Sequence, residues 1–299
     1  MVKKSERTTG KIAPPEQTKP RRPKARGGAA VRAVEGVGKP SKLSKKKLVQ
    51  QEIFEIYRRR GDMTFDNNLV REAAKNNDFG NAYDVTKTDN SGILAPAVLE
   101  QGYCIAHLGR GRHRFLKAAK VWFHRFEKIA TDPIKWPYRR SLLNETDTSE
   151  SNILSVGFNQ RIIHDFLYED IVASPKMYNA RRTKITTNYA VGAESLALEK
   201  VQMEIDLTTE YLGTVTIFEG KNKFPDDFAV YQLFHPFLHF KELQKKKQLS
   251  IKEINCCYML REKKKGNSII RLFLYTFDKE DSIGSIRLVK SAEYHLVTR

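Results

Sequence analysis

The fold of this chain is decided by residues 201–221, which read VQMEIDLTTEYLGTVTIFEGK. From Val201 to Thr208, apolar and polar residues alternate, which is the period of a strand with one face buried. Residues 211–213 are tyrosine, leucine and glycine and predict a turn, and residues 214–221 follow as an apolar return strand. We therefore predict a β-hairpin at this position.

Charged side chains of this hairpin are candidates for chemistry. Residues two apart on a strand point to the same side, so Glu219 and Lys221 share one face while Gly220 points away. If the hairpin pairs Asp206 with the region of Glu219, two carboxylates and one ammonium converge. Carboxylate oxygens are ligands that Mg²⁺ prefers, so we predict Asp206 and Glu219 as metal ligands, joined by Glu204 from the same strand face as Asp206. Lys221 would orient the attacking water or help to deprotonate it.

The same residues also have a purely structural interpretation. Asp206 and Lys221 could form an exposed cross-strand ion pair, which contributes only about a few tenths of a kcal/mol. The setting favours chemistry, because Glu219 ends an apolar strand and an amphipathic segment follows at once.

An aspartate on one strand of a hairpin and Glu-x-Lys at the end of the other resemble the signature of the PD-(D/E)XK nuclease superfamily. Asp206, Glu219 and Lys221 match its three catalytic positions, and Ile205 stands where the family name has proline. The resemblance implies that a glutamine on the following helix approaches the site, and Gln232 is the candidate. It also implies that an acidic residue on the preceding helix can assist the metal. The candidates for that role are Asp165, Glu169 and Asp170.

Residues 102–297 more specifically resemble the type II restriction endonucleases. Besides the hairpin, the resemblance rests on residues 109–115 (GRGRHRF), 149–154 (SESNIL), 158–167 (FNQRIIHDFL) and 224–229 (FPDDFA). It implies Mg²⁺-dependent cleavage of double-stranded DNA at a short specific sequence by a homodimer. Two alternatives remain open: a DNA repair or mobile-element nuclease on the same core, and a non-catalytic DNA-binding protein with a decayed site.

The other segments predict an α/β fold with a mixed central sheet flanked by helices, and the resemblance implies that this fold is restriction-endonuclease-like. Helices are predicted at 43–60, 68–75, 94–100, 153–171 and from 224 onward, where Pro225 suits a first helical turn. Strands are predicted at 102–108, 255–260 and 268–277, with further edge strands at 282–290 and 294–297, and residues 109–115 predict a basic turn. We expect three parts: a disordered basic arm (1–45), a mostly helical DNA-contacting region (46–144) and the nuclease domain (145–299).

The net charge of +18 favours a polyanionic partner, with nucleic acid the first candidate and an anionic membrane surface the second. The first 48 residues hold 15 Lys and Arg against 3 Asp and Glu, so the rest of the chain is only mildly basic. The arm is either a solubilising extension or a phosphate tether. Predicted DNA contacts, more to phosphates than to bases, are the basic side chains in loop-like settings: Arg110, Arg112, Arg114, Arg139, Arg140, Arg181, Arg182 and Lys184.

Several other classes of protein are disfavoured. The three cysteines form no CxxC pair, which argues against a disulfide framework or a zinc site and suits a reducing cytoplasm. No apolar run approaches the ~20 residues of a membrane span, and the absence of a P-loop predicts no NTP hydrolysis. His235 and His239 lie one helical turn apart, but no third ligand has a matching spacing, which favours surface or packing roles over zinc binding.

Overall fold

The computed structural model describes residues 43–142, 149–246, 250–264 and 267–298. The predicted basic arm, residues 1–45, lies outside the described residues except at its last three positions. Residues Leu43–Arg299 form one compact unit. One cluster of buried side chains includes Val49, Phe115 and Phe234, so the core continues across residue 145. The predicted boundary at residue 145, between a DNA-contacting region and a nuclease domain, therefore stays a prediction about the roles of the two parts.

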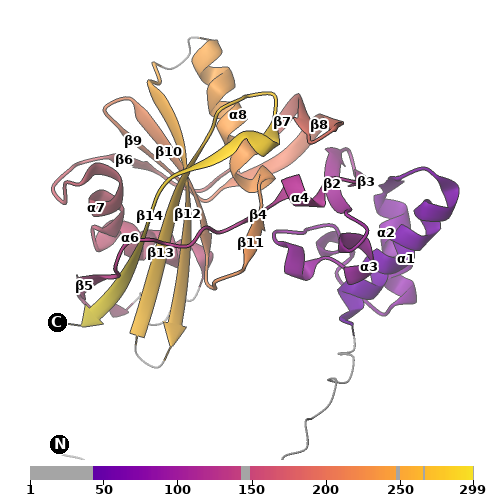
Figure 1. The fold of residues 1–299 in the computed structure, drawn as a ribbon, viewed down its shortest axis with the longest axis horizontal. Coiled ribbons are helices and arrows are strands. Elements are labelled where there is room, and N and C mark those ends of the chain that lie inside the picture. The colour runs from indigo at the N-terminus through magenta and orange to yellow at the C-terminus, as the bar shows by residue number, and fades with distance from the viewer. Residues whose placement is uncertain (1–42, 143–148, 247–249, 265–266, 299) are drawn as a thin grey trace, which may run out of the picture. The chain divides into compact units, whose positions relative to one another are not determined.

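The structure mixes helices and strands along the described chain (Figure 1). The α-helices are α1 (Lys45–Arg60), α2 (Asn67–Asn76), α3 (Pro96–Leu99), α4 (Ala119–Trp122), α6 (Glu150–Asn159), α7 (Ile162–Tyr168) and α8 (Tyr231–Lys245). The strands outside the central sheet are β1 (Thr64–Asp66), β2 (Cys104–Gly109), β3 (Arg112–Leu116), β4 (Phe123–Arg125), β7 (Arg181–Val191), β8 (Glu194–Ile205) and β11 (Asp227–Ala229). Within this part of the chain, no helix is long and apolar enough to cross a membrane.

A mixed central sheet flanked by helices confirms the coarse fold prediction. Its strands, in spatial order, are β5 (Ile134–Tyr138), β14 (Ile286–Thr298), β13 (Asn267–Phe277), β12 (Glu253–Lys264), β10 (Thr214–Lys221), β9 (Leu207–Tyr211) and β6 (Lys176–Tyr178). β10 runs parallel to β12, and β14 runs parallel to β5, while the other neighbours are antiparallel. The predicted hairpin is therefore β9–β10, and it lies inside the sheet.

Both faces of the central sheet are buried, which explains why β10 and β12 are apolar at successive positions. Ile217 and Cys256 point into the cluster that includes α8, whereas Phe218 and Cys257 point into a second cluster with α6 and α7. Figure 1 shows α8 on one side of the sheet and α6 and α7 on the other. Strands covered on both faces lose the alternation of polar and apolar residues.

The region before the central sheet is less helical than predicted. Helices α1 and α2 confirm two predictions, and α1 begins at the N-cap Ser44 and ends at Gly61, whose φ of 73° suits a left-handed cap. However, β1, β3 and β2 form a three-stranded sheet beside them. Residues 112–115, predicted as part of a basic turn, lie in strand β3 (Arg112–Leu116), and the turn itself is confined to Arg110 and Gly111.

Strands β7 and β8 form a separate two-stranded antiparallel sheet, which packs against β2. Gly109 makes this approach possible, since a Cβ at that position would lie 1.8 Å from the carbonyl oxygen of Glu199. Its φ of +93° is also a conformation that only glycine adopts easily. The turn that carries Arg110 is thereby held against β8.

Three further predictions about elements are wrong. The predicted helix at 153–171 is broken into α6 and α7 at Arg161, which adopts a left-handed φ of 63°. The predicted helix from residue 224 begins only at Tyr231, because residues 227–229 pair with β4 as β11, and it continues through Pro236. The predicted strand 201–208 is two strands, β8 and β9, which separate at Asp206. In each case pairing or packing with distant segments overrides the local pattern.

Candidate active site

The break between β8 and β9 places the carboxylate of Asp206. The β9–β10 ladder ends at the pair Leu207–Phe218, one residue before Asp206 and Glu219. There the backbone N–H of Gly220 donates a hydrogen bond to Asp206 Oδ2 at 3.0 Å. The structure therefore brings Asp206 beside Glu219, as the hairpin prediction required.

Glu219, Lys221 and Gln232 form one connected group at the end of β10. Lys221 Nζ lies 3.0 Å from Glu219 Oε1, and Gln232 Nε2 donates a hydrogen bond to the same oxygen at 2.7 Å. The hydroxyl of Tyr258, on β12, donates to Gln232 Oε1 at 3.3 Å and fixes the orientation of the amide. All three predicted side chains therefore converge, and α8 supplies the glutamine that the resemblance implied.

A fourth side chain of the group, Glu150, was missed from the sequence. It lies in the first turn of α6, and its Oε2 is 3.1 Å from Lys221 Nζ. Gly220 allows this approach, because a Cβ there would lie 3.3 Å from both the carbonyl oxygen of Glu150 and the side chain of Leu154. Two features of the sequence could have identified Glu150. The resemblance implied an acid on the helix before the hairpin, and Ser149 marks where that helix begins.

The three acids proposed for that position have other partners. Asp165 accepts a hydrogen bond from the hydroxyl of Tyr294 at 2.7 Å. Glu169 lies 3.5 Å from the ammonium of Lys290, and Asp170 accepts a hydrogen bond from a backbone N–H in its own turn. These three acids come after the break between α6 and α7, whereas Glu150 lies in the first turn of α6. Their surroundings therefore differ from those of Glu150.

Burial dominates the electrostatics of the group. Burial raises the pKa of Glu219 to about 8, with Lys221 acting to lower it and Asp206 to raise it. Burial also raises the pKa of Asp206, against the hydrogen bond from Gly220. For Lys221, burial acts to lower the pKa, but the carboxylates of Glu219 and Glu150 outweigh burial and raise it. The lysine therefore stays charged at neutral pH, and burial makes Glu219 harder to ionise than a carboxyl in solvent.

These residues line a pocket of about 660 Å³. Its acidic lining residues are Asp89, Glu150, Glu204, Asp206 and Glu219. Its basic lining residues, besides Lys221, are Lys87, Arg110, Arg112, Lys184 and Lys200. Carboxylates thus share one concave surface with cations, an arrangement suited to a ligand that carries phosphates and is accompanied by a metal ion.

The predicted DNA-contacting residues divide into two groups. Arg110, Arg112 and Lys184 line the pocket, and the two arginines lie 2.5 Å and 3.9 Å from the carboxylate of Glu199. The others are not among the residues lining this described pocket. They are Arg114, which pairs with Glu194, Arg182, which pairs with Glu204, and the exposed Arg139, Arg140 and Arg181.

Asp206 and Glu219 are the residues best placed to hold a metal ion. Across the described ranges, no group of three or more His, Cys, Asp and Glu side chains has an arrangement that could hold one. Mg²⁺, however, is commonly held by one or two carboxylates, with water and substrate phosphates completing its shell. The buried Glu219 carboxylate with its raised pKa fits this ion. Glu204 lines the same pocket, but its carboxylate lies 3.0 Å from Arg182 Nε, and its role as a ligand stays a prediction.

Comparison with known proteins gives a family but no activity. No curated protein matches this chain, and no solved structure matches it. A model for a domain of unknown function (DUF6997) matches residues 118–295, which is more than half of the chain and includes Asp206, Glu219, Lys221 and Gln232. The chain therefore belongs to the DUF6997 family.

Proposed function

We propose that this protein is a Mg²⁺-dependent endodeoxyribonuclease that cuts double-stranded DNA at a short specific sequence, as the type II restriction endonucleases that it resembles do. The observation that carries the proposal is the convergence of Asp206, Glu219, Lys221 and Gln232 at the end of one strand, inside one pocket. A surface ion pair between Asp206 and Lys221 does not account for this arrangement, because Glu219 is buried and bonded to both Lys221 and Gln232.

In this proposal each residue has a definite task. Asp206 and Glu219 hold the divalent cation. When bound, Mg²⁺ lowers the pKa of a coordinated water and stabilises the charge that develops on the phosphate. Lys221, kept protonated by Glu219 and Glu150, donates a hydrogen bond that orients the attacking water. Gln232 holds the carboxylate of Glu219 in place.

The reaction is hydrolysis of a phosphodiester bond. The oxygen of the attacking water forms a new bond to phosphorus, and the bond from phosphorus to the bridging oxygen breaks. The attacking water gives up one proton to solvent, and the leaving oxygen takes up one proton from solvent, so the step balances. Lys221 contributes by positioning because its ammonium is a donor, and a raised pKa makes it a poor general base at neutral pH.

The basic residues of the pocket support DNA as the substrate. Arg110 lies in the β2–β3 turn, Arg112 begins β3 and Lys184 lies in β7, so cations from two separate hairpins share the pocket with the carboxylates. Phosphate contacts by such side chains position the duplex without reading its sequence. Recognition of a specific site by a homodimer is the part of the proposal taken from the resemblance alone.

The test is a cleavage assay on phage DNA with Mg²⁺, with EDTA as the control and the oligomeric state measured by light scattering. Discrete fragments that require Mg²⁺ are the expected result. Cleavage only of nicked, branched or single-stranded DNA would replace restriction with a repair or mobile-element activity. DNA binding without any cleavage over a range of Mg²⁺ concentrations would overturn the assignment as a nuclease.

A further inference from the structure

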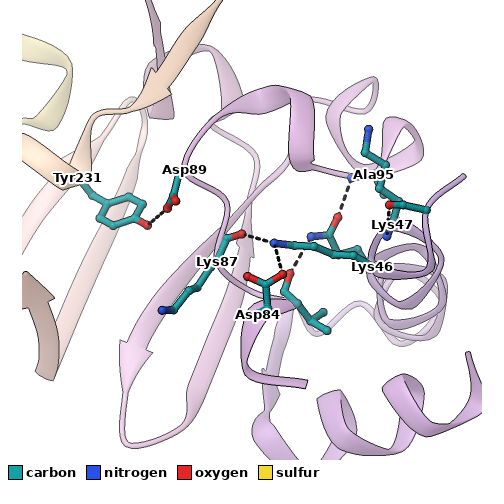
Figure 2. Close-up of polar contacts among 10 residues, drawn as sticks. Lys46, Lys47, Asp84, Lys87, Asp89, Ala95 and Tyr231 are labelled. Atoms are coloured by element: carbon teal, nitrogen blue, oxygen red, sulfur yellow. Dashed lines mark hydrogen bonds and ion pairs between the residues drawn. The ribbon is translucent and has the colours of Figure 1, made fainter. Parts of the chain in front are cut away.

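A loop from outside the matched family region reaches the pocket that holds Asp206 and Glu219. The loop lies between two short 3₁₀ helices, η1 (Ala82–Asp84) and η2 (Ser91–Ile93), and its residue Asp89 lines the pocket. Figure 2 shows the hydroxyl of Tyr231 donating to the Asp89 carboxylate, at 3.4 Å. Tyr231 is the neighbour in α8 of Gln232, which holds Glu219.

Helix α1 fixes this loop from one side. Lys46 Nζ donates to the carbonyl oxygen of Lys87 at 2.8 Å. The amide of Gln50, a fully buried side chain, donates to the carbonyl of Val85 at 2.7 Å and accepts from the N–H of Ala95 at 2.8 Å. A buried amide that satisfies the backbone on both sides of a loop restricts the conformations open to the loop.

Strand β11 fixes the loop from the other side. The backbone carbonyl of Asp89 accepts a hydrogen bond from the N–H of Ala229 at 2.8 Å. Ser91 donates two hydrogen bonds to the buried carboxylate of Asp227, from its N–H at 2.7 Å and from its hydroxyl. The position of Asp89 in the pocket is therefore determined by anchors before and after it in the chain.

Asp89 shares the pocket with the predicted catalytic side chains, since Glu219 and Lys221 are also among its lining residues. A charge on Asp89 therefore acts on a cation bound in this pocket.

We propose that the carboxylate of Asp89 supports, through the water shell, a cation held by Asp206 and Glu219, so that the region before residue 118 completes a site whose other residues lie in the DUF6997 domain. This rests on the proposed function, since it assumes that Asp206 and Glu219 hold a divalent cation. The carboxylate lowers the energy of a bound cation by its charge and by accepting hydrogen bonds from water molecules around that cation.

The test measures cation binding by the full chain without DNA. Mn²⁺ is the probe, since it shares the preference of Mg²⁺ for carboxylate and water ligands, and its affinity is measured by isothermal titration calorimetry. Asp89→Asn removes the charge but keeps an oxygen that can accept from Tyr231. We expect it to weaken Mn²⁺ binding roughly tenfold, as for the loss of one charge-assisted contact. The matched control is Asp278→Asn, at a carboxylate that pairs with Arg287, and it should change the affinity less than about twofold.

Asp206→Asn separates failure of this inference from failure of the proposed function. If wild type binds Mn²⁺ and Asp206→Asn does not, while Asp89→Asn binds as wild type does, the inference is overturned and the proposed function stands. If wild type itself binds no Mn²⁺, both are overturned. Hydrogen exchange of the wild type keeps the inference falsifiable if Asp89→Asn fails to fold. Mn²⁺ should protect amides around Asp89 as well as around Asp206, and unchanged exchange around Asp89 would overturn it.

Discussion

Two consecutive hairpins, β7–β8 and β9–β10, meet at Asp206 and give glutamates of the same kind very different surroundings. Glu204, near the end of β8, keeps 47% of its side chain exposed and pairs with Arg182. Glu219, near the end of β10, keeps 10% of its side chain exposed and is bonded to Lys221 and Gln232. The carboxylate of Glu204 in the two-stranded sheet is thus exposed to solvent, whereas the carboxylate of Glu219 in the central sheet is buried. Burial beside Lys221 and Gln232, and not residue type, distinguishes Glu219 from Glu204 as a candidate for catalysis.

The largest expected effect is on the cleavage rate, which should depend on side chains of the β9–β10 hairpin far more than on Glu204 of the β7–β8 hairpin. Glu219→Ala and Lys221→Ala should each lower the cleavage rate about 1,000-fold or more, because each removes a group that acts on the reacting phosphate or its water. Glu204→Ala should lower the rate less than about tenfold if the exposed carboxylate is not a ligand. The rates are measured with saturating DNA and Mg²⁺, after gel-shift experiments show that DNA binding persists. Equal losses for Glu204 and Glu219 would remove the distinction between the hairpins.

A smaller effect is expected on stability in the metal-free protein. The pKa of Glu219 is raised to about 8 from 4.5, so between these pH values the unfolded state has lost a proton that the folded state still holds. The contribution of the protonated Glu219 carboxyl to the free energy of unfolding therefore falls as the pH rises from about 4.5 to about 8. Glu219→Gln keeps the neutral form at every pH and should flatten this decline, with a gain on the order of 1–3 kcal/mol at pH 8.

Urea unfolding in EDTA at several pH values between 5 and 8.5 measures that effect. Glu204→Gln is the matched control, since it changes an exposed carboxylate on the neighbouring hairpin by the same atoms. Its stability should stay within about 0.5 kcal/mol of wild type at each pH. If Glu219→Gln follows the same pH profile as wild type, the burial of a protonated carboxyl in β10 is contradicted.

The smallest expected effect concerns DNA binding by the exposed hairpin. Replacing both Arg181 and Lys184 with alanine should weaken binding roughly tenfold at moderate salt and reduce the dependence of affinity on salt concentration. The cleavage rate at saturating DNA should change little, because neither residue contacts the catalytic group. Arg287→Ala, which removes a cation paired with Asp278, is the control. If the double variant binds DNA with the same salt dependence as wild type, the DNA does not contact β7.

The core of the site was predictable from local pattern. The alternation of residues 201–208, the apolar run of 214–221 and the turn between them placed Asp206 beside Glu219, with Lys221 on the same face. Gln232 followed from the resemblance alone. The strands at 255–260 and 268–277 were also predictable, because these mostly apolar segments lie within β12 and β13.

Other features depended on contacts between distant segments. Residues 227–229 form a strand only because β4 lies beside them, and the strand at 201–208 separates at Asp206 because its two halves join different sheets. Glu150 reaches Lys221 through close packing of α6 on Gly220, and Asp89 reaches the pocket through anchors on α1 and β11. None of these contacts leaves a periodic signal in the sequence.

The sequence by itself determined which residues could hold a metal and orient water, since a strand's two-residue period sets which side chains share a face. Only the tertiary structure decided which carboxylates are buried, which cations border them and which loop completes the pocket. The physical reason is that burial and charge interactions depend on distance in space, and the residues that meet at this site come from helices, strands and loops far apart along the chain.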